Sequence, residues 1–135
     1  MLKAVTMALV LFGALAAQQI KRVAVQPTLA GDGKAMFKEY CATCHGVEGR
    51  GNGPAMNATK KRPADLTQLA RKNRGTFPEV PVMNYINGDD AVAAHGTRDM
   101  PIWGTLFRSL DPESEGVAKI RVKVLADYIK TLQAQ

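Results

Sequence analysis

The stretch Cys41-Ala42-Thr43-Cys44-His45 decides how this sequence is interpreted. Two cysteines separated by two residues lie on one helical turn, where both thiols can form thioethers with the vinyl-derived carbons of one porphyrin. The histidine that follows the second cysteine offers its imidazole to the iron from one side. The motif therefore predicts one covalently attached haem c, held by Cys41 and Cys44, with His45 as the proximal iron ligand.

Other uses of the same cysteines fit the chain less well. A thioredoxin-like pair requires a βαβ context, of which the sequence shows no sign. A zinc site normally has four ligands, whereas the chain has only two cysteines and two histidines. A disulfide between cysteines two residues apart would be strained. Haem attachment remains the favoured interpretation.

A six-coordinate haem needs a second axial ligand. Met100 lies in a proline-bounded loop, Met100-Pro101-Ile102-Trp103-Gly104, in which Pro101 stiffens the chain and Trp103 can cover the haem edge. A thioether favours Fe(II) and raises the reduction potential, which suits electron transfer. We expect Met100 to be the distal iron ligand. The other candidates are Met36, Met56, Met83 and His95; His95 would lower the potential.

The N-terminus has the pattern of a secretory signal peptide. Lys3 precedes an uncharged apolar run at 4–17 that ends in Ala14-Leu15-Ala16, a small-residue cleavage pattern. The run is shorter than the ~20 apolar residues of a membrane-spanning helix. We expect a signal peptide at 1–17, an extended arm at 18–30, a domain at 31–135 and export to the periplasm. An uncleaved segment would instead anchor the chain to the membrane.

The composition is basic, with a formal net charge of +6 and a pI near 9.6. The basic residues are dispersed apart from Lys60-Lys61-Arg62 and the group Arg71, Lys72 and Arg74. Nucleic-acid binding is disfavoured because these groups lack interleaved aromatics and the chain is expected to be exported. An acidic redox partner, attracted by complementary charge, is the alternative.

Hydrophobic periodicity predicts an all-α chain. A helix begins at Asp32 and Gly33, a glycine-rich loop covers 46–63, and a short helix covers 65–72. Thr76 and Glu79 form a capping box for a helix that ends at Asn87, and 89–104 is a loop. The last helix begins at Val117, with Ile120 on its apolar face and Arg121 mostly on the others. We expect three to five short helices and long loops wrapped around one haem.

At this point the sequence resembles the class I c-type cytochromes, in particular bacterial single-haem members with a Met-Pro-x-Trp-Gly loop. The resemblance covers 31–133. It implies a cytochrome c-like fold in which the first and last helices cross, with Gly33 and Phe37 opposite Leu125 and Tyr128. It also implies that the carbonyl of Pro54 accepts a hydrogen bond from the proximal imidazole. The matching segments include Gly49-x-Gly51-x-Gly53-Pro54, Pro63-Ala64-Asp65-Leu66-Thr67 and Gly75-x-Phe77-Pro78.

These observations favour an electron carrier with no substrate reaction of its own. Its redox partners would be a dehydrogenase, a bc-type complex, an oxidase or another cytochrome. A dedicated haem c subunit of a periplasmic oxidoreductase complex is a variant of the same function. A gas-binding sensor or a weak peroxidase would need an open iron position, with His95 as the only further histidine for distal chemistry.

Overall fold

The computed structural model describes residues 27–89 and 100–134, so the predicted signal peptide and His95 lie outside the described residues. Within these ranges the chain forms helices and loops and no strand, which confirms the all-α prediction. None of the described helices is long and apolar enough to cross a membrane. The α-helices are α1 (Gly33–Met36), α2 (Ala42–His45), α3 (Leu69–Lys72), α4 (Glu79–Asn87), α5 (Trp103–Leu110) and α6 (Glu115–Thr131).

α1 and α2 are the two ends of one continuous helix, joined by a π-helical turn at Phe37–Cys41. The helix begins where the sequence predicts, because the carboxylate of Asp32 accepts a hydrogen bond from the backbone N–H of Ala35 at 2.8 Å. π-Helical turns are rare and are frequent at functional sites. Here the turn ends at Cys41, the first cysteine of the motif.

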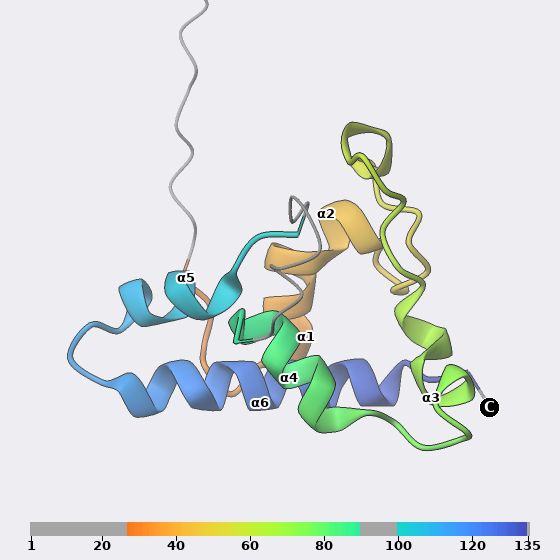
Figure 1. Cartoon of the computed structure of the whole chain (residues 1–135). Helices are drawn as coiled ribbons and strands as arrows, with labels where there is room; N and C mark the ends of the chain where they lie inside the picture. Colours follow the sequence, from red (N-terminus) through yellow and green to blue (C-terminus); the bar gives the residue numbers. More distant parts are fainter. Residues whose placement is uncertain (1–26, 90–99, 135) are drawn as a thin grey trace, which may run out of the picture.

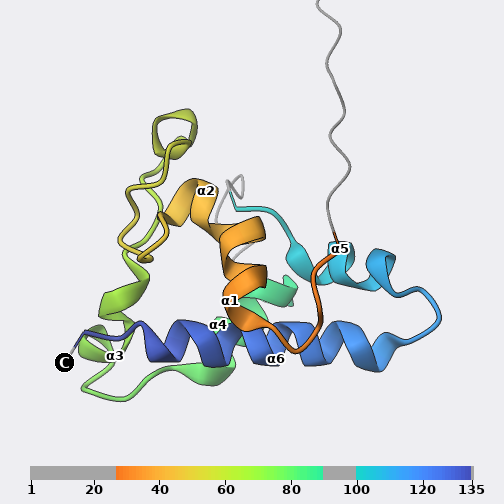
Figure 2. The same cartoon turned by 180° about the vertical axis from the view of Figure 1, so that it is seen from behind.

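The first helix crosses α6 near the middle of the molecule, as Figures 1 and 2 show. A Cβ on Gly33 would lie 2.6 Å from the carbonyl oxygen of Val124 and 2.8 Å from the Cβ of Tyr128, so only glycine permits this approach. The rings of Phe37 and Tyr128 pack with centroids 5.4 Å apart, and Leu125 is fully buried. The crossing implied by the family resemblance is confirmed.

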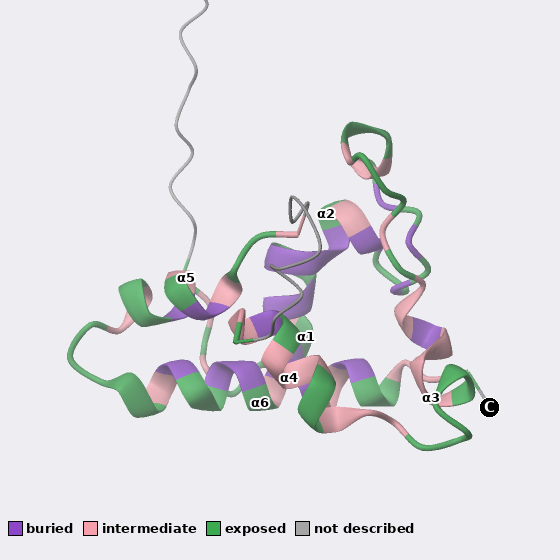
Figure 3. Ribbon diagram, viewed as in Figure 1, coloured by how far each residue is buried: buried purple, intermediate pink, exposed green. Residues whose placement is uncertain are grey.

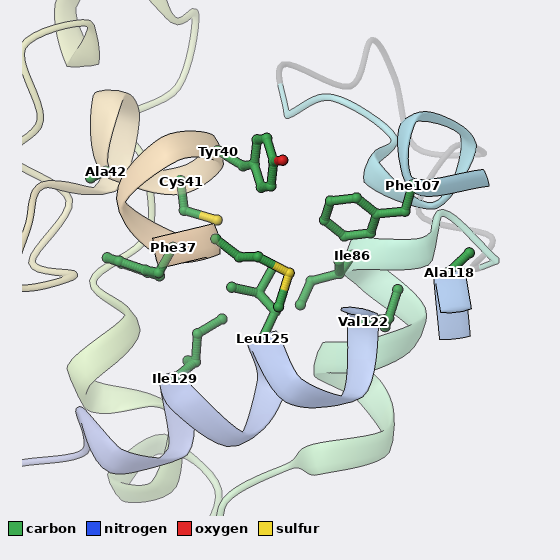
Figure 4. Packing of buried hydrophobic residues seen from close by; sticks show 11 residues of the cluster. Phe37, Tyr40, Cys41, Ala42, Ile86, Phe107, Ala118, Val122, Leu125 and Ile129 are labelled. Carbon is green, nitrogen blue, oxygen red and sulfur yellow. The ribbon is translucent and has the colours of Figure 1, made fainter. Parts of the chain in front are cut away.

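The core lies between the first helix, α4, α5 and α6. Figure 3 shows the buried surface of α6 turned toward the first helix, and Figure 4 shows the side chains that meet there. The buried cluster consists of Met36, Phe37, Tyr40, Cys41, Ala42, Ile86, Phe107, Ala118, Val122, Leu125 and Ile129. Cys41 is thus a member of the core as well as of the motif.

α5 is an element that the sequence analysis missed, since it ended the preceding loop at residue 104 and placed no helix after it. Trp103, Leu106, Phe107 and Leu110 have the spacing of one helical face, and all four pack in or against the core. This i, i+3, i+4, i+7 pattern was available in the sequence. The helix is short and begins two residues after Pro101, so the proline favoured the prediction of a loop over that of a helix.

The buried face of α6 also differs from the prediction. Ile120 is 52% exposed, whereas Arg121 is only 4% exposed. The guanidinium of Arg121 donates to the carboxylate of Asp111 at 2.9 Å and to the carbonyl of Thr28 at 2.7 Å. Because these acceptors satisfy the charge, burial is tolerated. Arg121 thereby ties the described part of the N-terminal arm to the core.

The start of α4 does not use the predicted capping box. The residue before the helix is Pro78, and no side chain caps the first turn. The carboxylate of Glu79 instead lies 3.4 Å from Lys123 and 3.6 Å from Lys130 of α6, so tertiary charge pairing replaces local capping. The predicted end is confirmed, because Gly88 adopts a left-handed φ of 89° after Asn87.

The crossing predicts a large difference between two glycine-to-alanine substitutions. Gly33→Ala would drive a methyl group into the backbone of Val124 and should lower the free energy of unfolding by about 2 kcal/mol. Gly31→Ala is the matched control, because a Cβ there meets no atom within 4 Å. Chemical denaturation of the haem-loaded protein measures both. Equal stability of the two variants would show that the helices do not cross at Gly33.

Candidate haem site

The two cysteines of the motif lie at the C-terminal end of the first helix, Cys41 in its π-helical turn and Cys44 in α2. Both are free thiols. Cys41 is buried, and in Figure 4 its side chain points into the core cluster. Burial, together with the nearby Cys44, raises the pKa of the Cys41 thiol to about 12. Cys44 is half-buried. The structure thus places both thiols on one segment, three positions apart.

The glycine loop that follows the motif closes the C-terminal end of α2. The last carbonyls of a helix have no partner within it and must find one elsewhere. Here the N–H of Gly51 donates to the carbonyl of His45 at 2.7 Å, that of Gly53 to Cys44 at 3.0 Å and that of Ala55 to Thr43 at 2.9 Å. The loop therefore fixes the backbone of the motif at the C-terminal end of α2.

Two features of this loop require glycine. Gly51 has a φ of 73°, in the left-handed region that side chains disfavour. Gly53 lies so close to α2 that a Cβ there would be 2.5 Å from the carbonyl oxygen of Thr43. Within the loop expected to be irregular, Gly53 is therefore a position of close backbone approach to the motif, and Gly51 is one of close approach to Pro63.

His45 is oriented by a backbone carbonyl. Its side chain is buried, and its Nδ1 lies 2.9 Å from the carbonyl oxygen of Ala64. Since a carbonyl only accepts, Nδ1 is the donor, and Nε2 is left as the atom available to a metal. Burial lowers the pKa of His45, and the hydrogen bond to Ala64 opposes this in part. A neutral, oriented imidazole is the form that ligates iron.

The carbonyl acceptor expected at Pro54 is instead that of Ala64. Pro54 is exposed, and its neighbours Gly53 and Ala55 bond through their N–H groups to the carbonyls of Cys44 and Thr43; the chain comes back to the motif a second time at Ala64. Gly51 makes this return possible, because a Cβ there would lie 2.3 Å from the carbonyl oxygen of Pro63. The expectation for Pro54 is wrong in this structure. The segment that holds Ala64 was quoted in the sequence analysis, but no local signal gave its distance from His45.

Ala64 is itself held in place by the turn that follows it. The carboxylate of Asp65 accepts hydrogen bonds from the backbone N–H of Thr67 at 3.0 Å and from its hydroxyl at 2.6 Å. These bonds lower the pKa of Asp65. The N–H of Leu66 donates to the carbonyl of Gly49 at 2.7 Å. The acceptor of the His45 hydrogen bond is therefore part of a rigid turn.

Met100 and Trp103 are partly buried, and both pack against the buried cluster. The Trp103 ring is 5.5 Å from the ring of Tyr40, the residue before Cys41, and 6.4 Å from that of Phe107. In Figures 1 and 2 the segment that begins at Met100 runs from beside α2 into α5. The structure brings Trp103 to the motif helix.

These residues fit a covalent haem. Two free thiols stand on one helix, and an imidazole with a committed Nδ1 follows directly. Cys41 and Cys44 would hold the porphyrin, and His45 would bind the iron through Nε2. When bound, the group supplies a one-electron Fe(III)/Fe(II) couple.

Comparison with known proteins agrees with this site. The family model described as "Cytochrome C oxidase, cbb3-type, subunit III" matches residues 28–114, well over half of the chain. The chain is also 32% identical over 113 residues to cytochrome c-551 of Stutzerimonas stutzeri, which covers 82% of this chain and 86% of that protein. No solved structure matches. The motif, the helix crossing and these matches place the chain in the class I c-type cytochrome family, electron carriers whose iron is held in a covalently bound haem c.

Proposed function

We propose that this protein is a periplasmic carrier that moves single electrons through one haem c attached to Cys41 and Cys44. His45 and Met100 are the axial ligands. The observation that carries the proposal is the fixed imidazole of His45, which sits on a helix end whose carbonyls are all bonded to the following loop. A carrier needs ligands that stay in place when the iron changes its charge, and this arrangement supplies one.

The assignment of the thioethers follows from the composition. The chain has only two cysteines, so a haem c attached through two thioethers must use Cys41 and Cys44. Cys41 is buried and Cys44 is half-buried, so one thioether would lie in the core and the other nearer the surface. The haem is then anchored to the same helix that crosses α6.

Met100 is supported as the distal ligand by its setting. It is half-buried against the core, and the next turn of chain is held by the contact of Trp103 with Tyr40. A segment fixed at this point can hold a thioether in place without long-range rearrangement. A sulfur ligand raises the reduction potential and keeps the iron six-coordinate, which disfavours the gas-binding alternative.

An electron carrier of this family can be a freely diffusing protein or a dedicated haem subunit of a complex. The family model that matches is named for a subunit of an oxidase, and this name would suit a dedicated haem subunit. The match to cytochrome c-551, which covers 86% of that protein, favours the freely diffusing carrier. Such a carrier catalyses no reaction on a substrate of its own.

The distal ligand is tested by two methionine-to-leucine substitutions, which remove sulfur and keep the volume. Met100→Leu should abolish the weak far-red absorption band of the oxidised protein, because that band reports the iron–sulfur bond, and the reduced protein should then bind carbon monoxide rapidly. Met56→Leu, at another half-buried methionine, should leave the spectrum unchanged. A far-red band that survives in Met100→Leu would assign the ligand elsewhere.

The carrier role is tested by fractionating the native cells. Osmotic release of the periplasm should yield the haem-stained chain as a small protein, with its N-terminus near residue 17. Recovery only in a detergent-solubilised complex would favour the dedicated subunit. A membrane-bound chain that runs as a single polypeptide and retains 1–17 would show an uncleaved anchor and contradict the proposed release.

A further inference from the structure

Residues 56–63 form a projecting loop, here called the basic lobe, whose two ends are bonded to the haem-motif helix. At one end the N–H of Ala55 donates to the carbonyl of Thr43 at 2.9 Å. At the other end the carbonyl of Ala64 accepts from Nδ1 of His45 at 2.9 Å. Figures 1 and 2 show the lobe standing out beyond α2 and away from α6. It is therefore a surface feature attached to the site itself.

The charge of the lobe is concentrated and of one sign. Lys60, Lys61 and Arg62 are consecutive and exposed, and the sequence of the lobe, 56–63, contains no acidic residue. Its largest apolar side chain is Met56, which is half-buried. Segments that bind a lipid surface combine basic residues with exposed large apolar ones, and the lobe lacks the second component. Its surface suits a polar, negatively charged partner.

Hydrogen bonds within the lobe also give it a defined conformation before any partner binds. The hydroxyl of Thr59 donates to the carbonyl of Met56 at 2.7 Å, and the N–H of Ala58 donates to the carbonyl of Ala55 at 2.9 Å. A preformed element loses little conformational entropy when it binds. The three charges directly follow this internally bonded turn.

We propose that the basic lobe is a docking element for an acidic protein surface on the redox partner. The inference rests on the proposed function, since it assigns a place on the molecule to the partner of an electron carrier. Attraction between the lobe and clustered carboxylates on the partner raises the rate at which the two proteins meet and orients them as they do. Because both ends of the lobe are bonded to the motif helix, docking there holds the partner beside the segment that carries His45.

The test uses the haem-loaded protein and poly-L-glutamate as the acidic probe, with binding followed by calorimetry at low ionic strength. The lobe variant is Lys60→Gln with Lys61→Gln and Arg62→Gln. The matched control is Arg71→Gln with Lys72→Gln and Arg74→Gln, which removes the same charge from three other exposed residues. The lobe variant should bind about tenfold more weakly than the unaltered protein, and the control should lose less than about threefold.

Amide NMR shifts of the reduced protein should map the probe to 56–64, and added salt should weaken the binding. Equal losses in the two variants would show that net charge alone acts and would overturn the inference, as would unchanged binding in the lobe variant. Lobe-dependent binding to phosphatidylglycerol vesicles that is tighter than binding to poly-L-glutamate would also overturn it. The absorption spectrum of each variant separates this result from the proposed function: a variant that keeps the His/Met haem spectrum but shows no lobe-specific loss of binding overturns the inference alone.

Discussion

The hydrogen bonds between the glycine loop and the end of α2 are the constraint on which the rest of the site depends. They satisfy the carbonyls of Thr43, Cys44 and His45 with backbone donors from the loop that follows the motif. At Gly51 the same loop lies against the backbone of Pro63. This close approach allows the carbonyl of Ala64 to reach Nδ1 of His45. The helix end, the imidazole orientation and the basic lobe are thus consequences of one loop path.

The other end of the motif helix is held by a different interaction. At Gly33 the backbone of the helix touches α6, and the Phe37–Tyr128 pair fills the crossing. Farther along, Tyr40 packs against Trp103 and Phe107 of α5, so the segment that carries Met100 joins the same helix. The haem attachment lies between two fixed points, the crossing and the loop. A group bound there is held by a rigid frame that need not rearrange when one electron enters or leaves.

Features of the site that depend on neighbouring residues could be predicted from the sequence, and features that depend on distant residues could not. Cys41, Cys44 and His45 form a contiguous motif with specific chemistry, and Gly33 and Phe37 are positioned by a recognisable crossing pattern. Ala64 was missed because it contributes a backbone carbonyl, which no residue type announces. Arg121 was placed on a solvent face because only the fold brings Asp111 and Thr28 to its guanidinium. In the same way, Glu79 could serve a local cap or α6, and tertiary contacts decided between them.

The loop path through Gly51 sets the hydrogen bond of His45, and the reduction potential of Gly51→Ala is the measurement that checks this dependence. The substitution would force Pro63 and Ala64 away from the motif. The imidazole would become a weaker donor to Fe(III), so the potential should rise and the Nδ1 proton of His45 should exchange faster. Gly75→Ala is the control, because Gly75 has a similar positive φ of 84° and a Cβ there meets nothing within 4 Å. An unchanged potential with a slowly exchanging proton in Gly51→Ala, or the same rise in Gly75→Ala, would show that the loop path does not set the hydrogen bond of His45.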